Sequence, residues 1–356
     1  MDATTAHRFP LIARPRPACT PLADRVAALH TLSAHAITTN NLADATYVFN
    51  QSALLASDCG AHDLARHWCH RLAHVALASQ HPGRYALEPV VNLARLRIRG
   101  GDGATAWTML ETLFSAVTDR TTVTIDGITI AAADLTDTHD THRDLREWAW
   151  KVLLGTGAHA LASAHRWDEA RHRLTHHRGI GGRMLDGRQI AVISHTLADR
   201  TDQAHAMLRD TTPGQPWENA VTGCLALLCT PARLPGASTA YHEHAPEPGL
   251  AVFWTRLGLS LIDALAPDQP RARALASRLL HHATDDGYAA RDVLAHPGCR
   301  RMATGEQLRR LRNLVDACGL DRGHLPADYT AQLTKLFDTV EPTIRSRSSH
   351  QPLTTP

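Results

Sequence analysis

The chain has 356 residues, with 37 basic and 35 acidic side chains, a formal net charge of +2 and an apolar fraction of 44%. This near-neutral balance argues against a general nucleic-acid coat protein and against a protein of the membrane surface. The seven cysteines are odd in number and include no C-x-x-C pair, which indicates reduced thiols in a cytoplasmic protein rather than a disulfide framework.

The N-terminal residues lack the features of a signal peptide. Residues 1–21 carry four prolines and no apolar run of the length that a signal peptide requires, so we expect residues 1–20 to form a flexible tail. The longest apolar stretch, residues 249–266, is interrupted by Arg256 and Asp263, so no membrane-spanning helix is predicted.

The rest of the chain is predicted to be mostly helical. The expected helices cover residues 22–38, 41–57, 61–79, 86–99, 103–118, 141–164, 167–177, 184–198, 200–209, 216–229, 250–265, 270–284, 305–317 and 327–339.

A helix–turn–helix phrase recurs along these helices. Residues 91–110, VNLARLRIRGGDGATAWTML, run from one helix through Gly-Gly-Asp-Gly into a second helix. Variants of the phrase occupy residues 49–66, 157–174 and 191–208. The alanines near the start of the second helices recur at steps of 41, 64 and 34 residues, at Ala65, Ala106, Ala170 and Ala204. Repeated helical hairpins of this length stack on their neighbours and usually bind along a surface.

The long 64-residue step predicts an insertion in the repeat. Residues 122–130, TVTIDGITI, alternate apolar and polar side chains around Asp126-Gly127. A two-residue turn of the primed type needs positive φ at both positions, and Asp-Gly is favoured there. We therefore expect a β-hairpin within residues 120–131. Because an isolated hairpin is marginal in water, it should pack on the helices or contact a partner.

These features resemble the tetratricopeptide repeat family over residues 41–115 and 145–210. The shared features are a small residue in each first helix, the Gly/Asp turn, an alanine opening each second helix and a large apolar residue four positions later, as at Leu110, Leu174 and Leu208. The resemblance implies an all-α fold, a right-handed α-solenoid of helical hairpins over residues 21–229 with a small β-hairpin insertion near 122–130. The chain lacks the usual closing proline, and its aromatic positions are mostly Leu, Ala or Arg. An irregular helical domain is the alternative.

The C-terminal third begins after a break in the helical pattern. Residues 230–249 are rich in proline and are expected to form a loop or linker. A C-terminal helical segment is expected over residues 250–339, followed by a flexible tail at 340–356. The pattern leaves open whether residues 250–339 continue the solenoid or fold back as a cap.

The resemblance places the first helix of each hairpin on the concave face of the solenoid. The large polar residues expected there are Asn50, Asp58, Asn92, Arg95, Arg99 and His159. Asn92, Arg95 and Arg99 step by three and four positions, so they share one helix face. Asn offers hydrogen bonds to a peptide backbone, and Arg offers a fork for a carboxylate or phosphate. Tetratricopeptide domains often clamp a peptide carboxylate with Asn and Lys, but the Lys partners are missing here. Ordinary exposed or capping side chains are the alternative.

Three functions fit this pattern. The first is a non-catalytic helical-repeat protein that binds a protein or peptide segment in its concave groove, as an adaptor or regulatory factor. The second is a helical enzyme or small-molecule-binding protein that uses a pocket of the solenoid. The third is a nucleic-acid-associated regulator that uses the arginines between Arg95 and Arg99 or between Arg300 and Arg312. The chain has no phosphate loop, nucleophile elbow or kinase signature, so no catalytic residue or cofactor is predicted. It also has no H-E-x-x-H or H-x-E…C-x-x-C pattern, so no metal ligand is predicted.

Overall fold

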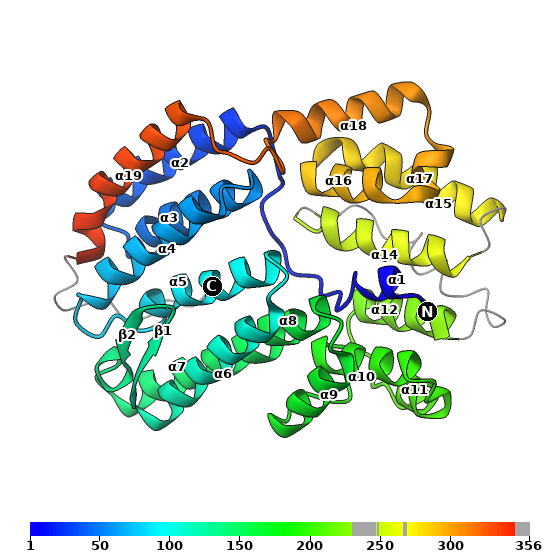
Figure 1. Cartoon of the computed structure of the whole chain (residues 1–356), viewed down its shortest axis with the longest axis horizontal. Coiled ribbons are helices and arrows are strands. Elements are labelled where there is room, and N and C mark those ends of the chain that lie inside the picture. Colours follow the sequence, from blue (N-terminus) through cyan, green and yellow to red (C-terminus); the bar gives the residue numbers. More distant parts are fainter. Residues whose placement is uncertain (230–246, 248, 266–268, 346–356) are drawn as a thin grey trace. The chain divides into compact units, whose positions relative to one another are not determined.

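The computed structural model describes residues 1–229, 247, 249–265 and 269–345, and these residues are mostly helical with one two-stranded sheet (Figure 1). The all-α class is therefore confirmed. The chain forms two compact units, each made of two stretches of sequence. Unit 1 comprises residues 1–22 and 158–320, and unit 2 comprises residues 23–157 and 321–356.

This division differs from the predicted domains, because it does not fall at the proline-rich segment. Residues 230–246 and 248 of that segment lie outside the described residues. The boundaries fall near residues 22, 157 and 320 instead, since the chain leaves each unit and later returns to it. A repeat pattern read along the chain does not reveal such returns. The right-handed solenoid itself stays a prediction.

Unit 2 contains six long helices, a β-hairpin and the C-terminal helix. Its elements are α2 (Leu22–Thr38), α3 (Leu42–Asp58), α4 (His62–Leu77), α5 (Arg84–Arg99), α6 (Gly103–Asp119), β1 (Thr122–Ile125), β2 (Ile128–Ala131), the 3-10 helix η1 (Ala132–Leu135), α7 (His139–Val152), the π-helix η2 (Leu153–Gly157) and α19 (Ala327–Arg345). Side chains cap several of these helices. The Asn41 side chain accepts hydrogen bonds from the first turn of α3, Asp102 does so for α6, and Thr138 forms a capping box with Thr141 at α7.

The aromatic core of unit 2 joins the two ends of its sequence. Helices α3, α4, α5 and α6 pack on one another in chain order, and α19 returns to pack on α3 and α4 (Figure 1). Phe337 of α19 stacks on Phe49 of α3 at 4.0 Å between ring centroids, and the edge of Trp68 approaches the Phe337 ring at 5.1 Å. All three rings are buried. Such aromatic pairs add to the stabilisation that burial provides.

The predicted β-hairpin is confirmed. Strands β1 and β2 pair antiparallel from Thr122 opposite Ala131 to Ile125 opposite Ile128. Asp126 and Gly127 have φ angles of 49° and 81°, as the two-residue turn requires. Ile128 and Ile130 are buried, so the hairpin packs one face on the unit.

The turn of the hairpin is anchored by its aspartate. The Asp126 carboxylate accepts hydrogen bonds from Arg66 and His70 of α4 and from Arg97 of α5. Burial acts to raise the pKa of Asp126, but the hydrogen bonds from Arg66 and His70 hold the pKa below its usual value. Asp126 therefore joins the hairpin to the helices, in addition to its role in the turn.

Unit 1 holds the remaining helices. They are α1 (Ala3–Ala6), α8 (Ala158–Ser163), α9 (Trp167–His176), α10 (Asp186–Leu197), α11 (Thr201–Arg209), α12 (Pro216–Cys229), α14 (Ala251–Ala264), α15 (Pro270–His282), the 3-10 helix η3 (Ala283–Asp285), α16 (Gly287–Ala295), α17 (Pro297–Met302) and α18 (Gly305–Ala317). Helices α16 and α17 were not expected from the sequence, because Gly287 and Pro297 resemble helix breakers. Asp286 and His296 cap these two helices, and Pro297 occupies the first turn of α17, where no N–H is needed.

The helix predicted over residues 141–164 is divided into three parts. Helix α7 ends at Val152, five residues form the π-helix, and α8 follows. Glycine is a weak helix former, and the π-helix contains Gly155 and Gly157. A Cβ atom at Gly157 would lie 2.9 Å from the Trp107 ring, so this close approach of backbone to ring requires glycine.

The structure differs from the prediction for both expected tails. Residues 1–20 pack into unit 1, with Phe9, Leu11 and Cys19 between 0% and 3% exposed. They do not form a flexible tail, because their apolar side chains are buried and their backbone is hydrogen-bonded. Helix α19 extends through Arg345, and residues 346–356 lie outside the described residues. Among the described helices, none is long and apolar enough to cross a membrane.

Candidate functional site

Five of the six predicted groove residues lie on two neighbouring helices of unit 2. Asn50 and Asp58 belong to α3, and Asn92, Arg95 and Arg99 belong to α5. The sixth, His159, belongs to α8 in unit 1.

Three of these residues, together with Glu88, form a directed chain of hydrogen bonds, here called the asparagine ladder (Arg95, Asn92, Asn50 and Glu88). Arg95 Nη1 donates to Asn92 Oδ1 at 2.8 Å, and Asn92 Nδ2 donates to Asn50 Oδ1 at 2.8 Å. Asn50 Nδ2 then donates to Glu88 Oε2 at 3.2 Å. The asparagine ladder therefore crosses from α5 to α3 and back.

Glu88 ends the asparagine ladder and was not predicted from the sequence. It lies four positions before Asn92, so the same spacing that joins Asn92, Arg95 and Arg99 would have placed it on their face. Burial raises the pKa of Glu88 above its usual value, although the positive charges of Arg84 and Arg95 act to lower it.

The second group is a buried carboxylate held by two arginines. Asp58 accepts from Arg25 Nη2 of α2 at 2.6 Å and from Arg99 Nη1 at 3.0 Å, and its side chain is 2% exposed. Arg99 also donates to Ser57 Oγ at 2.7 Å. A carboxylate at the C-terminus of a helix is disfavoured by the helix dipole, so these two guanidinium groups compensate for its position and burial. Asp58 thus connects α2, α3 and α5. Arg25 is too distant in sequence for the repeat pattern to have revealed it.

The arginines of this face remain accessible from solvent. Residues Arg95 and Arg99 are exposed, whereas Asn50 and Asn92 are partly buried. We call this surface the α3–α5 face: the asparagine ladder together with Asp58 and Arg99. Its chemistry is that of amide donors and acceptors beside two guanidinium forks, which suits a peptide backbone, a carboxylate or a phosphate.

His159 lies in a different environment. Burial, followed by the charge of Arg256, lowers the pKa of His159 to about 4. The imidazole is therefore neutral at pH 7 and does not attract an anion there.

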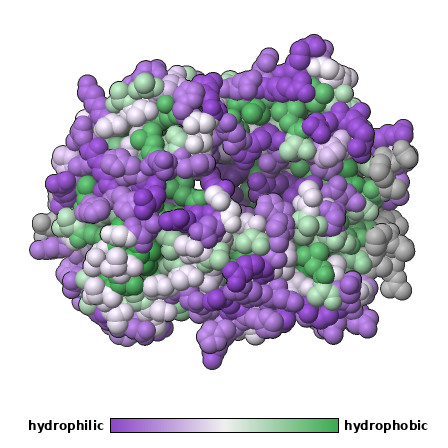
Figure 2. All heavy atoms as spheres, in the orientation of Figure 1, coloured by the Kyte–Doolittle hydropathy of each residue, from purple (hydrophilic) through white to green (hydrophobic). Residues whose placement is uncertain are grey.

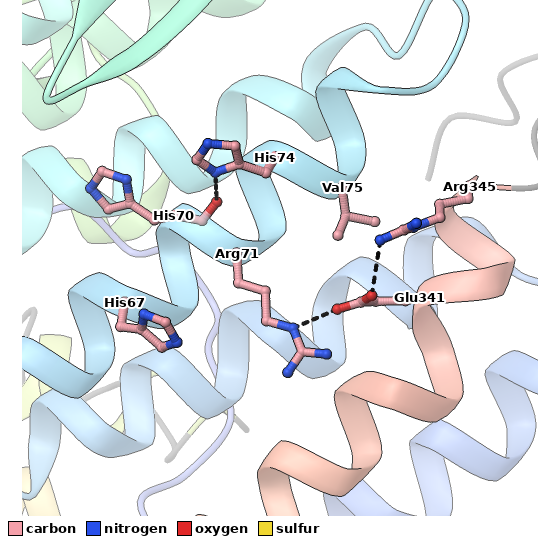
Figure 3. Close-up of a pocket in the computed structure, with 7 residues that line it drawn as sticks. All are labelled: His67, His70, Arg71, His74, Val75, Glu341 and Arg345. Atoms are coloured by element: carbon pink, nitrogen blue, oxygen red, sulfur yellow. Dashed lines mark hydrogen bonds and ion pairs between the residues drawn. The ribbon is translucent and has the colours of Figure 1, made fainter.

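An open groove of about 450 Å³ lies between α4 and α19 of unit 2 (Figure 3). His67, His70, Arg71 and His74 line it from α4, and Glu341 and Arg345 line it from α19. Glu341 accepts from Arg71 Nε at 2.5 Å and from Arg345 Nη2 at 3.3 Å, so the carboxylate joins the two helices. The Arg71 guanidinium also lies 5.5 Å from the centre of the Phe337 ring, which extends the contact between α4 and α19 into the aromatic core. The side chains that line the groove therefore help to hold α19 against α4.

The surface drawn in Figure 2 mixes polar and apolar residues. Among the described residues, the exposed large apolar side chains are Ile37, Tyr47, Leu185 and Leu197. Isolated exposed apolar residues are normal for folded proteins. Within the same described part of the chain, no group of three or more His, Cys, Asp or Glu side chains is placed to hold a metal ion.

Comparisons with protein-family models, with curated proteins and with solved structures give no match to this chain. The geometry of the side chains therefore provides the functional argument.

Proposed function

We propose that the chain is a helical interaction protein whose α3–α5 face binds a segment of a protein partner, in the role of an adaptor or regulatory factor. The asparagine ladder supports this proposal. It links α3 and α5 through polar side chains, and its first donor is the exposed Arg95 of α5.

The asparagine ladder favours binding because it orients Arg95 before a ligand arrives. Arg side chains lose considerable rotamer freedom when they are ordered, and a guanidinium that is already held costs less to immobilise on binding. Arg95 is held by Asn92, and Arg99 is held by Ser57 and Asp58. An acidic or carboxylate-bearing segment could thus bind two guanidinium groups that are already oriented on one face of α5.

The test compares matched charge reversals in unit 2. Arg95→Glu with Arg99→Glu reverses two charges on the α3–α5 face. Arg143→Glu with Arg146→Glu makes the same change of charge on the exposed side of α7. Each full-length variant is used to capture partners from the lysate of its own cells, followed by mass spectrometry. We expect a partner that is retained by the α7 variant and lost from the α3–α5 variant.

Folding is controlled in the same experiment. Arg99 contacts the buried Asp58, so the double variant is compared with Arg95→Glu alone, which leaves that ion pair intact. Circular dichroism and thermal melting establish that each variant is folded. If folded Arg95→Glu and the double variant keep every partner that the α7 variant keeps, the α3–α5 face is not the binding surface.

A further inference from the structure

Residues 1–20, here called the N-terminal strap, are held in unit 1 much as an extended peptide is held by a receptor. After α1, no residue from Phe9 to Pro21 belongs to a helix or strand. The side chains of Phe9, Leu11 and Cys19 are buried, while residues 14–18 between them are exposed. The N-terminal strap is therefore anchored at two places with an exposed stretch between them.

The first anchor recognises the backbone of one residue. Gln189 of α10 is 0% exposed, and its Oε1 accepts from the Leu11 N–H at 2.7 Å. Its Nε2 donates to the Leu11 carbonyl at 2.8 Å and to the Met184 carbonyl at 3.1 Å. A neighbouring β-strand makes the same pair of bonds to an extended residue. Gln189 therefore recognises a backbone N–H and C=O, which any extended segment can offer.

The second anchor repeats this recognition at Cys19. The Cys19 N–H donates to Asp286 Oδ2 at 3.2 Å, and the Cys19 carbonyl accepts from the Gly287 N–H at 2.8 Å. Asp286 is itself 3% exposed and caps α16 with its other carboxylate oxygen. Both anchors are therefore buried polar groups that use the N–H and C=O of one residue of the N-terminal strap.

Acidic side chains of unit 1 bind two of the arginines of the N-terminal strap, Arg8 and Arg14. Asp263 of α14 accepts from Arg8 Nη1 at 2.5 Å and from Thr5 Oγ1 at 2.8 Å. Asp186 of α10 accepts from Arg14 Nη2 at 2.9 Å. Charge-assisted bonds of this kind select for a basic segment. We call the set Gln189, Asp186, Asp263 and Asp286 the strap site.

We propose that the strap site is a binding site for an extended, basic, proline-containing segment of a partner protein, and that the N-terminal strap is its resident occupant. Main-chain recognition at two points supplies affinity, and the aspartates supply the preference for basic side chains. From Phe9 onward the N-terminal strap belongs to no helix or strand, so a competing segment can replace it without breaking a helix. This proposal does not rest on the α3–α5 face, which belongs to unit 2.

The experiment measures binding of a fluorescent synthetic peptide of residues 1–20 to the full-length chain by anisotropy. Thr5→Ala with Arg8→Ala removes the contacts of the N-terminal strap with Asp263 and leaves Gln189 in place. The apparent affinity of a site depends on the fraction of molecules in which it is open. We expect peptide binding to this variant to be about tenfold tighter than to the unmodified chain. A peptide with Phe9→Asp and Leu11→Asp should not bind.

Two further variants, made in the Thr5→Ala/Arg8→Ala background, locate the peptide. Gln189→Ala should abolish binding. Asp186→Asn, which keeps the shape of this partly buried side chain, should weaken binding and covers the case in which Gln189→Ala does not fold. Arg95→Glu/Arg99→Glu should leave peptide binding unchanged, which separates this proposal from the function proposed for unit 2.

Three results overturn the proposal. The first is no binding of the peptide to the folded Thr5→Ala/Arg8→Ala chain at about 1 mM, a concentration that would detect even weak affinity. The second is equal binding of the Asp-substituted control peptide. The third is a dimer of this variant in sedimentation that forms without peptide, which would identify a second copy of the chain as the occupant.

Discussion

The α3–α5 face of unit 2 and the strap site of unit 1 contain similar side chains, but these side chains bind different partners. Both combine carboxamide side chains with buried carboxylates that come from more than one helix or helix cap. On the α3–α5 face these groups bond to one another and orient two arginines whose residues are exposed. At the strap site they bond to the backbone of an extended segment. The partners of a polar side chain, rather than its type, thus decide whether it stabilises the fold or binds another segment.

The largest effect should come from Asp58. Removal of one member of a buried ion pair leaves the other charge uncompensated, so Asp58→Ala should lower the free energy of unfolding by about 3 kcal/mol. Asp119→Ala is a matched control, because Asp119 also ends a helix but belongs to an exposed position. Urea unfolding gives the stability, and hydrogen exchange should place the loss in unit 2. An equal, small effect of both substitutions would mean that the two arginines do not depend on Asp58.

Gln189→Ala should have the next largest effect, in unit 1. The substitution leaves the Leu11 N–H and C=O buried without their partner, which should cost about 2–3 kcal/mol. Gln203→Ala, on the exposed side of α11, should change stability by less than about 0.5 kcal/mol. Hydrogen exchange should accelerate first in residues 1–20. Unchanged exchange there would contradict the role assigned to Gln189.

Acid should weaken the N-terminal strap through Asp263. Burial acts to raise the pKa of Asp263, but hydrogen bonds from His296 and Arg8 lower it to about 2, below the ordinary value of 3.8. A depressed carboxyl pKa stabilises the folded state above the unfolded pKa. About 2 kcal/mol should therefore be present above pH ~4 and lost as the pH falls from ~4 to ~2. Urea unfolding across this range measures the effect. Asp263→Asn should flatten it, and an unaltered pH profile would exclude Asp263 as its source.

The smallest effect on stability should come from Arg95→Glu. Arg95 is exposed, but its substitution removes the bond to Asn92 and a positive charge near Glu88, so it should change the free energy of unfolding by about 1 kcal/mol or less. Partner capture should nevertheless fall, which distinguishes a binding residue from a structural one. Arg146→Glu on α7 is the control for charge. A large loss of stability with Arg95→Glu would instead make the asparagine ladder a structural device.

Local patterns were sufficient for most of the elements. Periodic apolar residues and turn glycines located the long helices, and the Asp126-Gly127 pair located the hairpin turn, because these signals act within a few residues. The same local spacing placed Asn92, Arg95 and Arg99 on one face and would have included Glu88. The exceptions have local causes as well. The π-helix depends on the fit of Gly157 against Trp107, and α17 begins at a proline that resembles a breaker.

The sequence by itself determined the helical class, the hairpin and the spacing of polar residues along α5, since each follows from backbone geometry over short distances. Only the tertiary structure decided which residues meet across long distances. It brought Arg25 to Asp58, Phe337 to Phe49, and Leu11 to Gln189. The N-terminal strap illustrates the reason: its prolines prevent a regular helix, but whether an extended segment is free or bound depends on buried groups far along the chain that complete its hydrogen bonds.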